Sequence, residues 1–206
     1  AEHHDRTGEY PTVVAAQAFE LGLLNVTIDD QYGGAGLGHF EEALITEELA
    51  FGCSGMAISM TVNNLSSVPI MIGGTEDQKK KWLGMLTAEH CTASYCLSEP
   101  DSGSDAASLR TTADRKGDSY LINGNKAWVS GGAHARYFTL FASTDPGSGH
   151  EGITCFVVPA DAPGIEVGKK EDMMGQRASD TVFINFQDVE IPVDHRIGDE
   201  GQGFRI

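Results

Sequence analysis

Long apolar runs and basic residues are both scarce in this chain of 206 residues. No run approaches the roughly 20 apolar residues that a membrane-spanning helix requires, so we expect no membrane span. Residues 1–5 do not resemble a signal or transit peptide. Lys and Arg number 14 against 30 Asp and Glu, which gives a formal net charge of −16. Such a chain repels phosphate polyanions, so we expect no nucleic-acid partner, although a few backbone N–H groups can still bind one small anionic ligand.

Cysteine is also infrequent, and its arrangement argues against a metal centre. No cysteine belongs to a C-x-x-C pair, and no two stand at zinc-ligand spacing with a histidine; the four are Cys53, Cys91, Cys96 and Cys155. The seven histidines are scattered and form no H-E-x-x-H pattern. We therefore expect buried free thiols in a reducing compartment and no metal site.

The chain does contain enough apolar sequence for a core, together with abundant glycine. It is 40% hydrophobic and 21% charged, which is typical of a globular protein. Its 25 glycines make up about 12% of the chain, against about 7% on average. This excess indicates many tight turns and places where backbone approaches backbone or a ligand closely.

Apolar residues recur at helical spacing through the first ~90 residues. A capping box, Thr75-Glu76-Asp77-Gln78, marks the start of the last helix in this region. The pattern predicts an all-helical domain over residues 1–92. Its periodic stretches are residues 11–24, 40–51, 56–72 (interrupted at Pro69) and 79–86.

The glycine-rich residues 33–38 lie between the first two helical stretches. Their spacing does not fit G-x-G-x-x-G, because that motif beginning at Gly34 would need glycine in place of His39. No predicted strand precedes them either. We interpret them as a helix-to-helix loop and not as a dinucleotide-binding loop.

From residue 93 onward the chain consists of short β-branched and aromatic runs separated by turns. Asn123-Gly124 stands between two such runs and predicts a two-residue hairpin. The pattern predicts a small antiparallel barrel or sandwich over residues 93–199, and hence an α+β fold class for the chain. Residues 200–206 would begin a linker, and the abrupt stop at Ile206 suggests a fragment. The runs are residues 120–122, 137–142, 153–158 and 182–186, with further turns at 145–147 and 162–164.

Two segments offer groups suited to a flat cofactor that carries phosphates. Residues 95–104 begin on a predicted strand and break into Ser, Gly and Pro, whose N–H and O–H groups can donate to a pyrophosphate. Ser98 could meet the polar edge of an isoalloxazine ring. Trp128 offers a stacking surface worth about 1 kcal/mol beyond its buried area, and Ser130 would share its face of a strand. An ordinary Ser/Gly turn and a core tryptophan are the alternatives.

At these residues the chain resembles the acyl-CoA dehydrogenases, and most closely the medium-chain type. Residues 96–108, CLSEPDSGSDAAS, fit the family signature at every constrained position, with Asp101 and Ser102 in place of a commoner Gly-Ala. Residues 124–130, GNKAWVS, are similar to the family's G-x-K-x-W-I-[TS] strand. Further matches are the Y-G-G-x-G-x-G loop at Tyr32, GQRASDT at residues 175–181 and DVEIP at residues 188–192.

The resemblance implies a fold and a reaction. The family has an N-terminal helical domain, a middle β-domain and a C-terminal four-helix bundle, of which this chain covers most of the first and all of the second. Its enzymes remove a proton α to the acyl-CoA carbonyl and pass the β hydrogen to FAD as hydride, giving trans-2-enoyl-CoA in fatty-acid β-oxidation. The catalytic base is a glutamate of the absent bundle, expected beyond Ile206, so we predict no catalytic residue in this chain and a structural role for Glu99.

The resemblance also assigns binding residues. Ser130 would lie near flavin N5, Trp128 would pack against the ring, and Ser104 would touch both FAD and acyl-CoA. A helix carrying three residues at helical spacing would line the acyl pocket, with ordinary helix core as the alternative; these are Ile58, Thr61 and Leu65. The expected FAD-binding residues are Tyr95, Cys96, Leu97, Ser98, Gly103, Ser104, Trp128, Val129 and Ser130.

Partners and location follow from the family alone. It implies a homotetramer that passes electrons to electron-transferring flavoprotein in the mitochondrial matrix, with bacterial cytoplasm as the alternative location. A medium-chain substrate is expected by resemblance, although the sequence does not fix acyl chain length. An acyl-CoA oxidase and a non-catalytic acyl-CoA-binding or protein-binding relative are alternative functions. Because the bundle supplies part of the flavin site, the hypothesis is that this chain alone binds FAD weakly and does not turn over.

Overall fold

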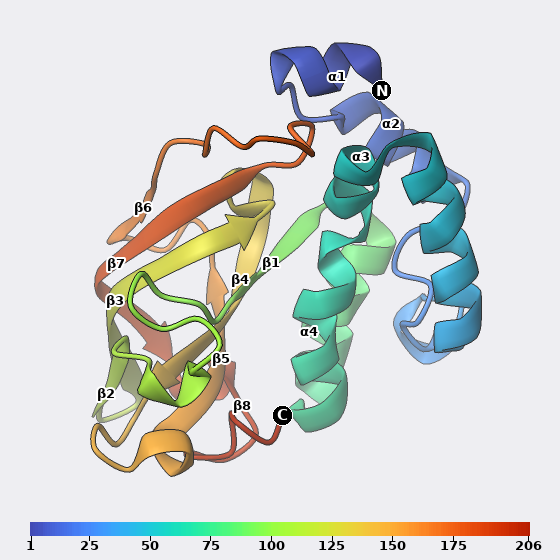
Figure 1. Ribbon diagram of the computed structural model, residues 1–206. Helices are drawn as coiled ribbons and strands as arrows, with labels where there is room; N and C mark the ends of the chain where they lie inside the picture. The colour runs from blue at the N-terminus through green and yellow to red at the C-terminus, as the bar shows by residue number, and fades with distance from the viewer.

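The computed structural model describes all 206 residues and places a helical part beside a single sheet (Figure 1). The sequence-predicted α+β fold class, with helices before strands, is confirmed. None of the helices combines the length and the apolar character that crossing a bilayer demands. The helices are α1 (Glu2–Thr7), α2 (Thr12–Glu20), α3 (His39–Gly73) and α4 (Glu76–Ala88). The strands are β1 (Thr92–Cys96), β2 (Thr112–Lys116), β3 (Ser119–Ser130), β4 (Ala135–Ser143), β5 (Ile153–Pro159), β6 (Ile165–Val167), β7 (Thr181–Pro192) and β8 (Arg196–Ile197).

The sheet is mostly antiparallel and runs in the order β6-β7-β3-β2-β4-β5-β8, with β1 added to β4. Only the β1–β4 and β2–β4 pairs are parallel. The two longest strands, β3 and β7, pair along nearly their whole length. Strand β1 follows α4 in the chain and pairs in parallel with β4, so it connects the helical part directly to the sheet.

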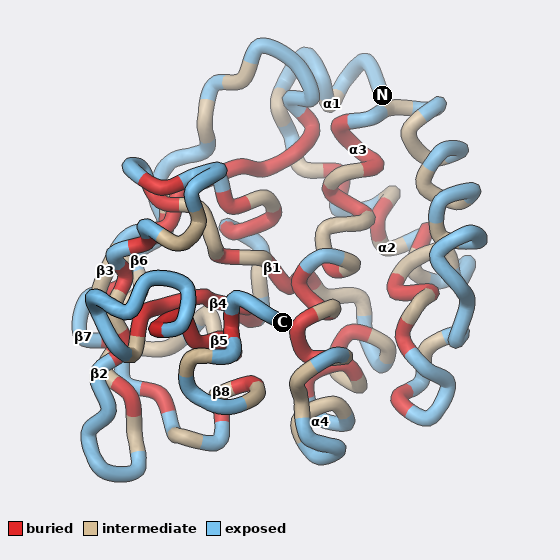
Figure 2. The backbone as a smooth tube through the Cα atoms, turned by 60° about the horizontal axis from the view of Figure 1, so that its bottom comes forward, coloured by how far each residue is buried: buried red, intermediate tan, exposed pale blue.

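The strand β4 is buried on both faces, which explains its continuous apolar run. Phe138, Leu140 and others on one side pack into a core formed by strands alone. Tyr137 and Phe141, on the other side, pack with α4 residues such as Leu83. Alternate residues of a strand point to opposite faces, so a strand between two cores needs apolar residues on both. Figure 2 shows the resulting concentration of buried residues in the strands and on the helix faces nearest them.

The predicted helices form, with adjusted boundaries. The capping box of α4 is confirmed: Thr75 accepts from the Gln78 N–H at 3.3 Å, and Gln78 accepts from the Thr75 N–H at 2.9 Å. Helix α2 ends at Glu20 and does not reach Leu24, because the chain turns at Gly22 with φ 70°.

The second and third predicted stretches form two helices, which together make up the 35 residues labelled α3 and are separated by a kink at the non-helical Cys53 (Figure 1). Pro69 does not interrupt the helix as expected. A proline removes one helical hydrogen bond, but here the fully buried Ser66 and Ile70 on either side anchor the helix to the core. The Gly33–38 region lies in the connection between α2 and α3, as interpreted from its sequence.

The Asn123-Gly124 hairpin prediction is wrong. Both residues lie inside β3, where the register with β7 shifts between Ile122 and Gly124. The hairpin turn is at Gly117, which has φ 63° and connects β2 to β3. Gly124 has φ 151°, and a Cβ there would lie 2.4 Å from Thr111 Oγ1. The glycine therefore permits a close backbone approach within a strand and does not form a turn.

The helical part and the sheet meet at a buried histidine, at the contact between α4 and a short turn, Val193–His195. His195 packs edge-on against Trp82, with ring centroids 5.1 Å apart, and its Nε2 lies 3.3 Å from Lys81 Nζ. Burial lowers the pKa of His195 below its ordinary 6.5, and the Lys81 charge lowers it further, against a smaller opposing effect of Asp194. The neutral imidazole is therefore the form that the folded state favours.

This contact predicts a pH dependence of stability. Because the unfolded state takes up the His195 proton at the higher pH, its contribution is complete above about pH 6.5 and declines as the pH falls below that value. We expect His195→Gln to flatten the decline in the free energy of unfolding between pH 7 and pH 5, measured by urea denaturation. The exposed His150, replaced by Gln, should leave the decline unchanged. An undiminished decline in His195→Gln would show that other groups cause it.

Candidate cofactor and substrate site

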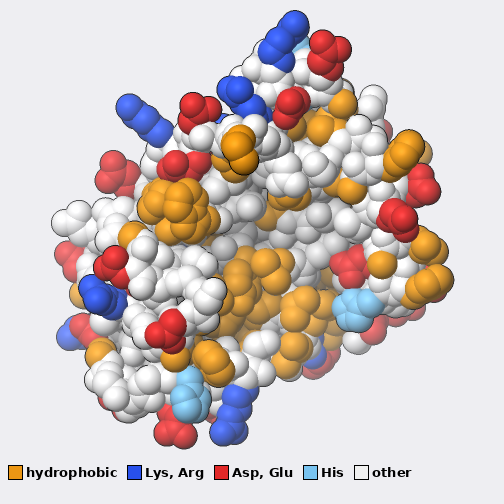
Figure 3. All heavy atoms as spheres, in the orientation of Figure 1, with side chains coloured by type: hydrophobic (Ala, Val, Ile, Leu, Met, Phe, Trp, Pro, Cys, Tyr) orange, Lys and Arg blue, Asp and Glu red, His pale blue; other side chains and the backbone are white.

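A pocket of about 390 Å³ opens between α3 and the ends of β1 and β3. Figure 3 shows the hollow between the sheet and the helices, with apolar side chains gathered in it. Most of the lining is apolar, with hydroxyl groups at Thr61, Tyr95, Ser98 and Ser130. The lining residues are Ile58, Thr61, Val62, Leu65, Tyr95, Leu97, Ser98, Ala127, Trp128 and Ser130.

This pocket brings together eight of the site residues expected from the sequence. Five come from the FAD set, namely Tyr95, Leu97, Ser98, Trp128 and Ser130. The other three, Ile58, Thr61 and Leu65, come from the acyl-pocket set. Val62 and Ala127 also line it and were not singled out, although Val62 lies one helical turn after Ile58 and was detectable from that spacing.

The remaining expected residues lie elsewhere. The side chains of Cys96 and Val129 are buried in the sheet core, so only their backbone could reach a ligand. Gly103 and Ser104 are exposed in the loop that follows Pro100 and do not line the pocket. Their roles in binding FAD or acyl-CoA stay predictions.

The α3 residues of the pocket are distinct from the core residues of the same helix. Met56, Ala57 and Met60 are the buried apolar side chains of this segment. Ile58 is only partly buried, and Leu65 is 58% exposed. Since the two sets occupy different faces, ordinary helix core does not account for Ile58 and Leu65.

Trp128 has an unusual backbone for its size. Its φ is 60°, and the register of β3 with β7 shifts between Lys126 and Val129, which is the mark of a β-bulge. Trp128 is 60% exposed, and its ring packs edge-on against Phe183, with centroids 5.1 Å apart. A left-handed φ in a bulky residue is strained, and such strain gathers at functional sites. The bulge breaks the alternation expected from the sequence, yet both Trp128 and Ser130 line the pocket.

A buried ion pair lies behind the pocket wall. Lys126 is fully buried and donates from Nζ to Glu99 Oε1 at 2.8 Å and to the Leu97 carbonyl at 2.9 Å. Glu99 also accepts the backbone N–H groups of Arg110 at 2.6 Å and Thr111 at 2.9 Å. The pair therefore ties the end of β1, the loop before β2 and the bulge of β3 together. The structural role expected of Glu99 agrees with these contacts, whereas Lys126 was missed because its partner could not be read from the sequence.

Burial disfavours the charged form of Glu99, whereas its contacts favour that form. Desolvation alone would raise the pKa of Glu99, but the Lys126 ammonium and the N–H donors outweigh it and lower that pKa below its ordinary value. The stability contributed by the Glu99 carboxylate is therefore present above the ordinary carboxyl pKa and is lost as the pH falls through the lowered one.

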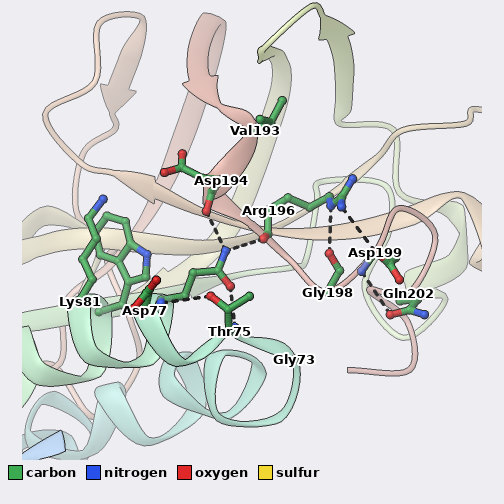
Figure 4. A pocket seen from close by; sticks show the side chains of 12 residues that line it. Gly73, Thr75, Asp77, Lys81, Val193, Asp194, Arg196, Gly198, Asp199 and Gln202 are labelled. Atoms are coloured by element: carbon green, nitrogen blue, oxygen red, sulfur yellow. Dashed lines mark hydrogen bonds and ion pairs between the residues drawn. The ribbon is translucent and has the colours of Figure 1, made fainter.

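A larger pocket of about 510 Å³ lies between the start of α4 and the segment around β8 (Figure 4). Gln78 spans it by donating to the carbonyls of Asp194 and Arg196, both at 2.7 Å. The Arg196 side chain donates to the Gly198 carbonyl at 2.9 Å. Its aromatic residue, Trp82, is only 3% exposed. Because these polar groups satisfy one another and no aromatic face is open, we assign the candidate site to the smaller pocket. No group of three or more His, Cys, Asp or Glu side chains anywhere in the chain is arranged to hold a metal ion.

Comparison with known proteins assigns both parts of the chain to one family. Residues 1–90 match the acyl-CoA dehydrogenase N-terminal domain, and residues 94–189 match the acyl-CoA dehydrogenase middle domain. The chain belongs to the acyl-CoA dehydrogenase family.

Individual relatives agree with this assignment. The chain is 44% identical, over its whole length, to the probable medium-chain specific acyl-CoA dehydrogenase 2, mitochondrial, of Caenorhabditis briggsae, and covers 51% of it. It is 39% identical to the mitochondrial isobutyryl-CoA dehydrogenase of Dictyostelium discoideum, covering all of this chain and 50% of the relative. The chain thus spans about half the length of the curated relatives it matches.

Solved structures show the same fold. Butyryl-CoA dehydrogenase from Megasphaera elsdenii superposes with a TM-score of 0.94 at 35% identity, over 98% of this chain and 54% of that one. The prolyl acyl carrier protein oxidase AnaB superposes with a TM-score of 0.93 at 33% identity, over the same shares of each chain.

The buried ion pair predicts that removing one of its two charges strongly lowers the stability of the fold. Glu99→Gln leaves the Lys126 ammonium buried without a counter-charge, so we expect a loss of about 3–5 kcal/mol in the free energy of unfolding. The double variant Glu99→Gln/Lys126→Met removes both charges and should recover most of that loss. Denaturant unfolding measures both.

The matched control is the exposed ion pair of the same loop, Asp101 with Arg110 at 3.3 Å. Both side chains are largely exposed, so Asp101→Asn should change stability by less than about 1 kcal/mol. If Glu99→Gln were no more destabilising than Asp101→Asn, the pair would not hold the three segments together.

Proposed function

We propose that this chain forms the flavin wall and part of the acyl pocket of an FAD-dependent acyl-CoA dehydrogenase. The proposed reaction removes the α and β hydrogens of an acyl-CoA thioester to give a trans-2-enoyl-CoA. One observation carries the proposal: a single pocket is lined both by residues expected to bind FAD and by residues expected to bind the acyl chain. Membership of the acyl-CoA dehydrogenase family supports the same reaction.

The groups in the pocket suit an isoalloxazine ring. Trp128 offers an exposed aromatic ring, and Leu97 and Ala127 are further apolar residues of the lining. The hydroxyls of Ser98 and Ser130 line the same pocket, and neither makes a hydrogen bond within the chain. Cofactor sites typically combine apolar walls with a few such polar groups. Bound FAD would supply the acceptor for the two electrons that leave the substrate.

The chain's own residues would bind and orient, and none would take the proton. Trp128 and the α3 residues Ile58 and Leu65 would exclude water from the reacting carbons, and Ser130 would orient the ring. No carboxylate or histidine lines the pocket. Proton abstraction therefore requires a group from outside this pocket lining, which agrees with the family's glutamate on its C-terminal bundle.

We further propose a medium-chain acyl substrate, electron-transferring flavoprotein as acceptor, a homotetramer and the mitochondrial matrix. The name of the C. briggsae relative, medium-chain specific and mitochondrial, supports the first and the last. An oxidase is the second candidate, because the similar structure AnaB is named a prolyl acyl carrier protein oxidase. Adding octanoyl-CoA to the full-length protein separates the two. A dehydrogenase reduces added electron-transferring flavoprotein and forms little peroxide, whereas stoichiometric peroxide would favour the oxidase.

The flavin wall predicts the effect of removing the indole. Trp128→Ala should weaken FAD binding by about tenfold, since aromatic stacking contributes about 0.5–1.5 kcal/mol beyond area burial and 1.4 kcal/mol equals a factor of ten. Fluorescence titration of the apoprotein with FAD measures this. Phe51→Ala is the control, because Phe51 is 91% exposed and does not line the pocket. Equal affinities of the two variants would contradict a flavin at Trp128.

A further inference from the structure

The peptide group between Leu97 and Ser98 is held from its inner side. Lys126 Nζ donates to the Leu97 carbonyl at 2.9 Å, and the Ala127 N–H donates to the Ser98 carbonyl at 2.8 Å. Glu99 accepts from the same ammonium at 2.8 Å and so fixes its position. Two successive carbonyls at the pocket wall are therefore engaged by two successive residues of β3.

This arrangement fixes where the Ser98 N–H points. A trans peptide is planar, with its N–H opposite its C=O, and the chain contains no cis peptide bond. The Leu97 carbonyl points to the buried ammonium, so the Ser98 N–H points away from it. That N–H donates to no backbone carbonyl of the chain, and Ser98 lines the pocket.

We propose that Lys126, held by Glu99, is a positioning residue that aims the Ser98 N–H at the polar edge of the bound flavin and strengthens it as a donor. A hydrogen bond to the carbonyl of a peptide polarises the peptide, and an ammonium does so more than a neutral donor. The inference rests on the proposed function, because it needs FAD in this pocket. An uncharged pair of similar volume could stabilise the fold equally well, but it would not bind the Leu97 carbonyl.

The test uses the double variant Glu99→Gln/Lys126→Met in the full-length protein. It contains no unpaired buried charge, yet it lacks the ammonium on Leu97. We expect its FAD affinity to fall about tenfold or more, and the midpoint potential of its bound flavin to become more negative, because the donor to the reduced ring is weaker. Asp101→Asn, which removes an exposed charge from the same loop, should match the wild type in both measurements.

A second variant reaches the same N–H without touching the ion pair. Ser98→Pro removes that N–H together with the side-chain hydroxyl, so Ser98→Ala, which removes the hydroxyl alone, is its control. Ser98→Pro should weaken FAD binding and lower the midpoint potential more than Ser98→Ala does, while Glu99 and Lys126 stay in place. If the double variant or Ser98→Pro folds and retains the wild-type affinity and potential, the positioning role is overturned while the proposed function stands. If the wild-type protein itself binds no FAD, the proposed function fails and this inference fails with it.

Discussion

The Lys126 ammonium, buried among strands and satisfied by Glu99 and the Leu97 carbonyl, is the contact on which the candidate site depends. A buried charge without partners is strongly unfavourable. The segments that carry Glu99 and Leu97 are therefore held next to the Lys126 ammonium. Glu99 brings the loop before β2 to it through two backbone N–H groups. The end of β1 and the bulge of β3, which supply most of the pocket's non-helical wall, are thereby held side by side.

The bulge of β3 follows from the same arrangement. Lys126 points into the interior and Val129 packs in the sheet core, while the register with β7 shifts between them. The extra residue turns Trp128 outward with a left-handed φ. A tryptophan that is 60% exposed on a strained backbone contributes little to the stability of the fold. Its position at the pocket would instead allow its ring to stack against a flat ligand. The strained, exposed Trp128 and the hydroxyls of Ser98 and Ser130 thus lie together at this pocket.

Much of this could be predicted from the sequence, and the failures have physical causes. Apolar periodicity found the helices and strands because it reflects which face is buried, and the capping box of α4 depends only on local residues. The Asn123-Gly124 prediction failed because a dipeptide that favours a turn also permits close backbone packing inside a strand. At Gly124 the close neighbour is Thr111, which lies outside the local sequence on which the prediction depended. The bulge at Trp128 and the partnership of Glu99 with Lys126 depend on strand register, which no local pattern contains. The family was found through long motifs, whereas the inward direction of Cys96 and Val129 became known only from the fold.

We propose that a flavin binds between Trp128, Ser130 and Ser98, beside the α3 residues of the pocket. The most direct measurement is a crystal structure of the full-length protein with FAD. We expect the isoalloxazine ring to lie against Trp128, with its polar edge at Ser98. A ring bound elsewhere, such as in the polar pocket between α4 and β8, with Trp128 and Ser98 free of contact, would contradict it.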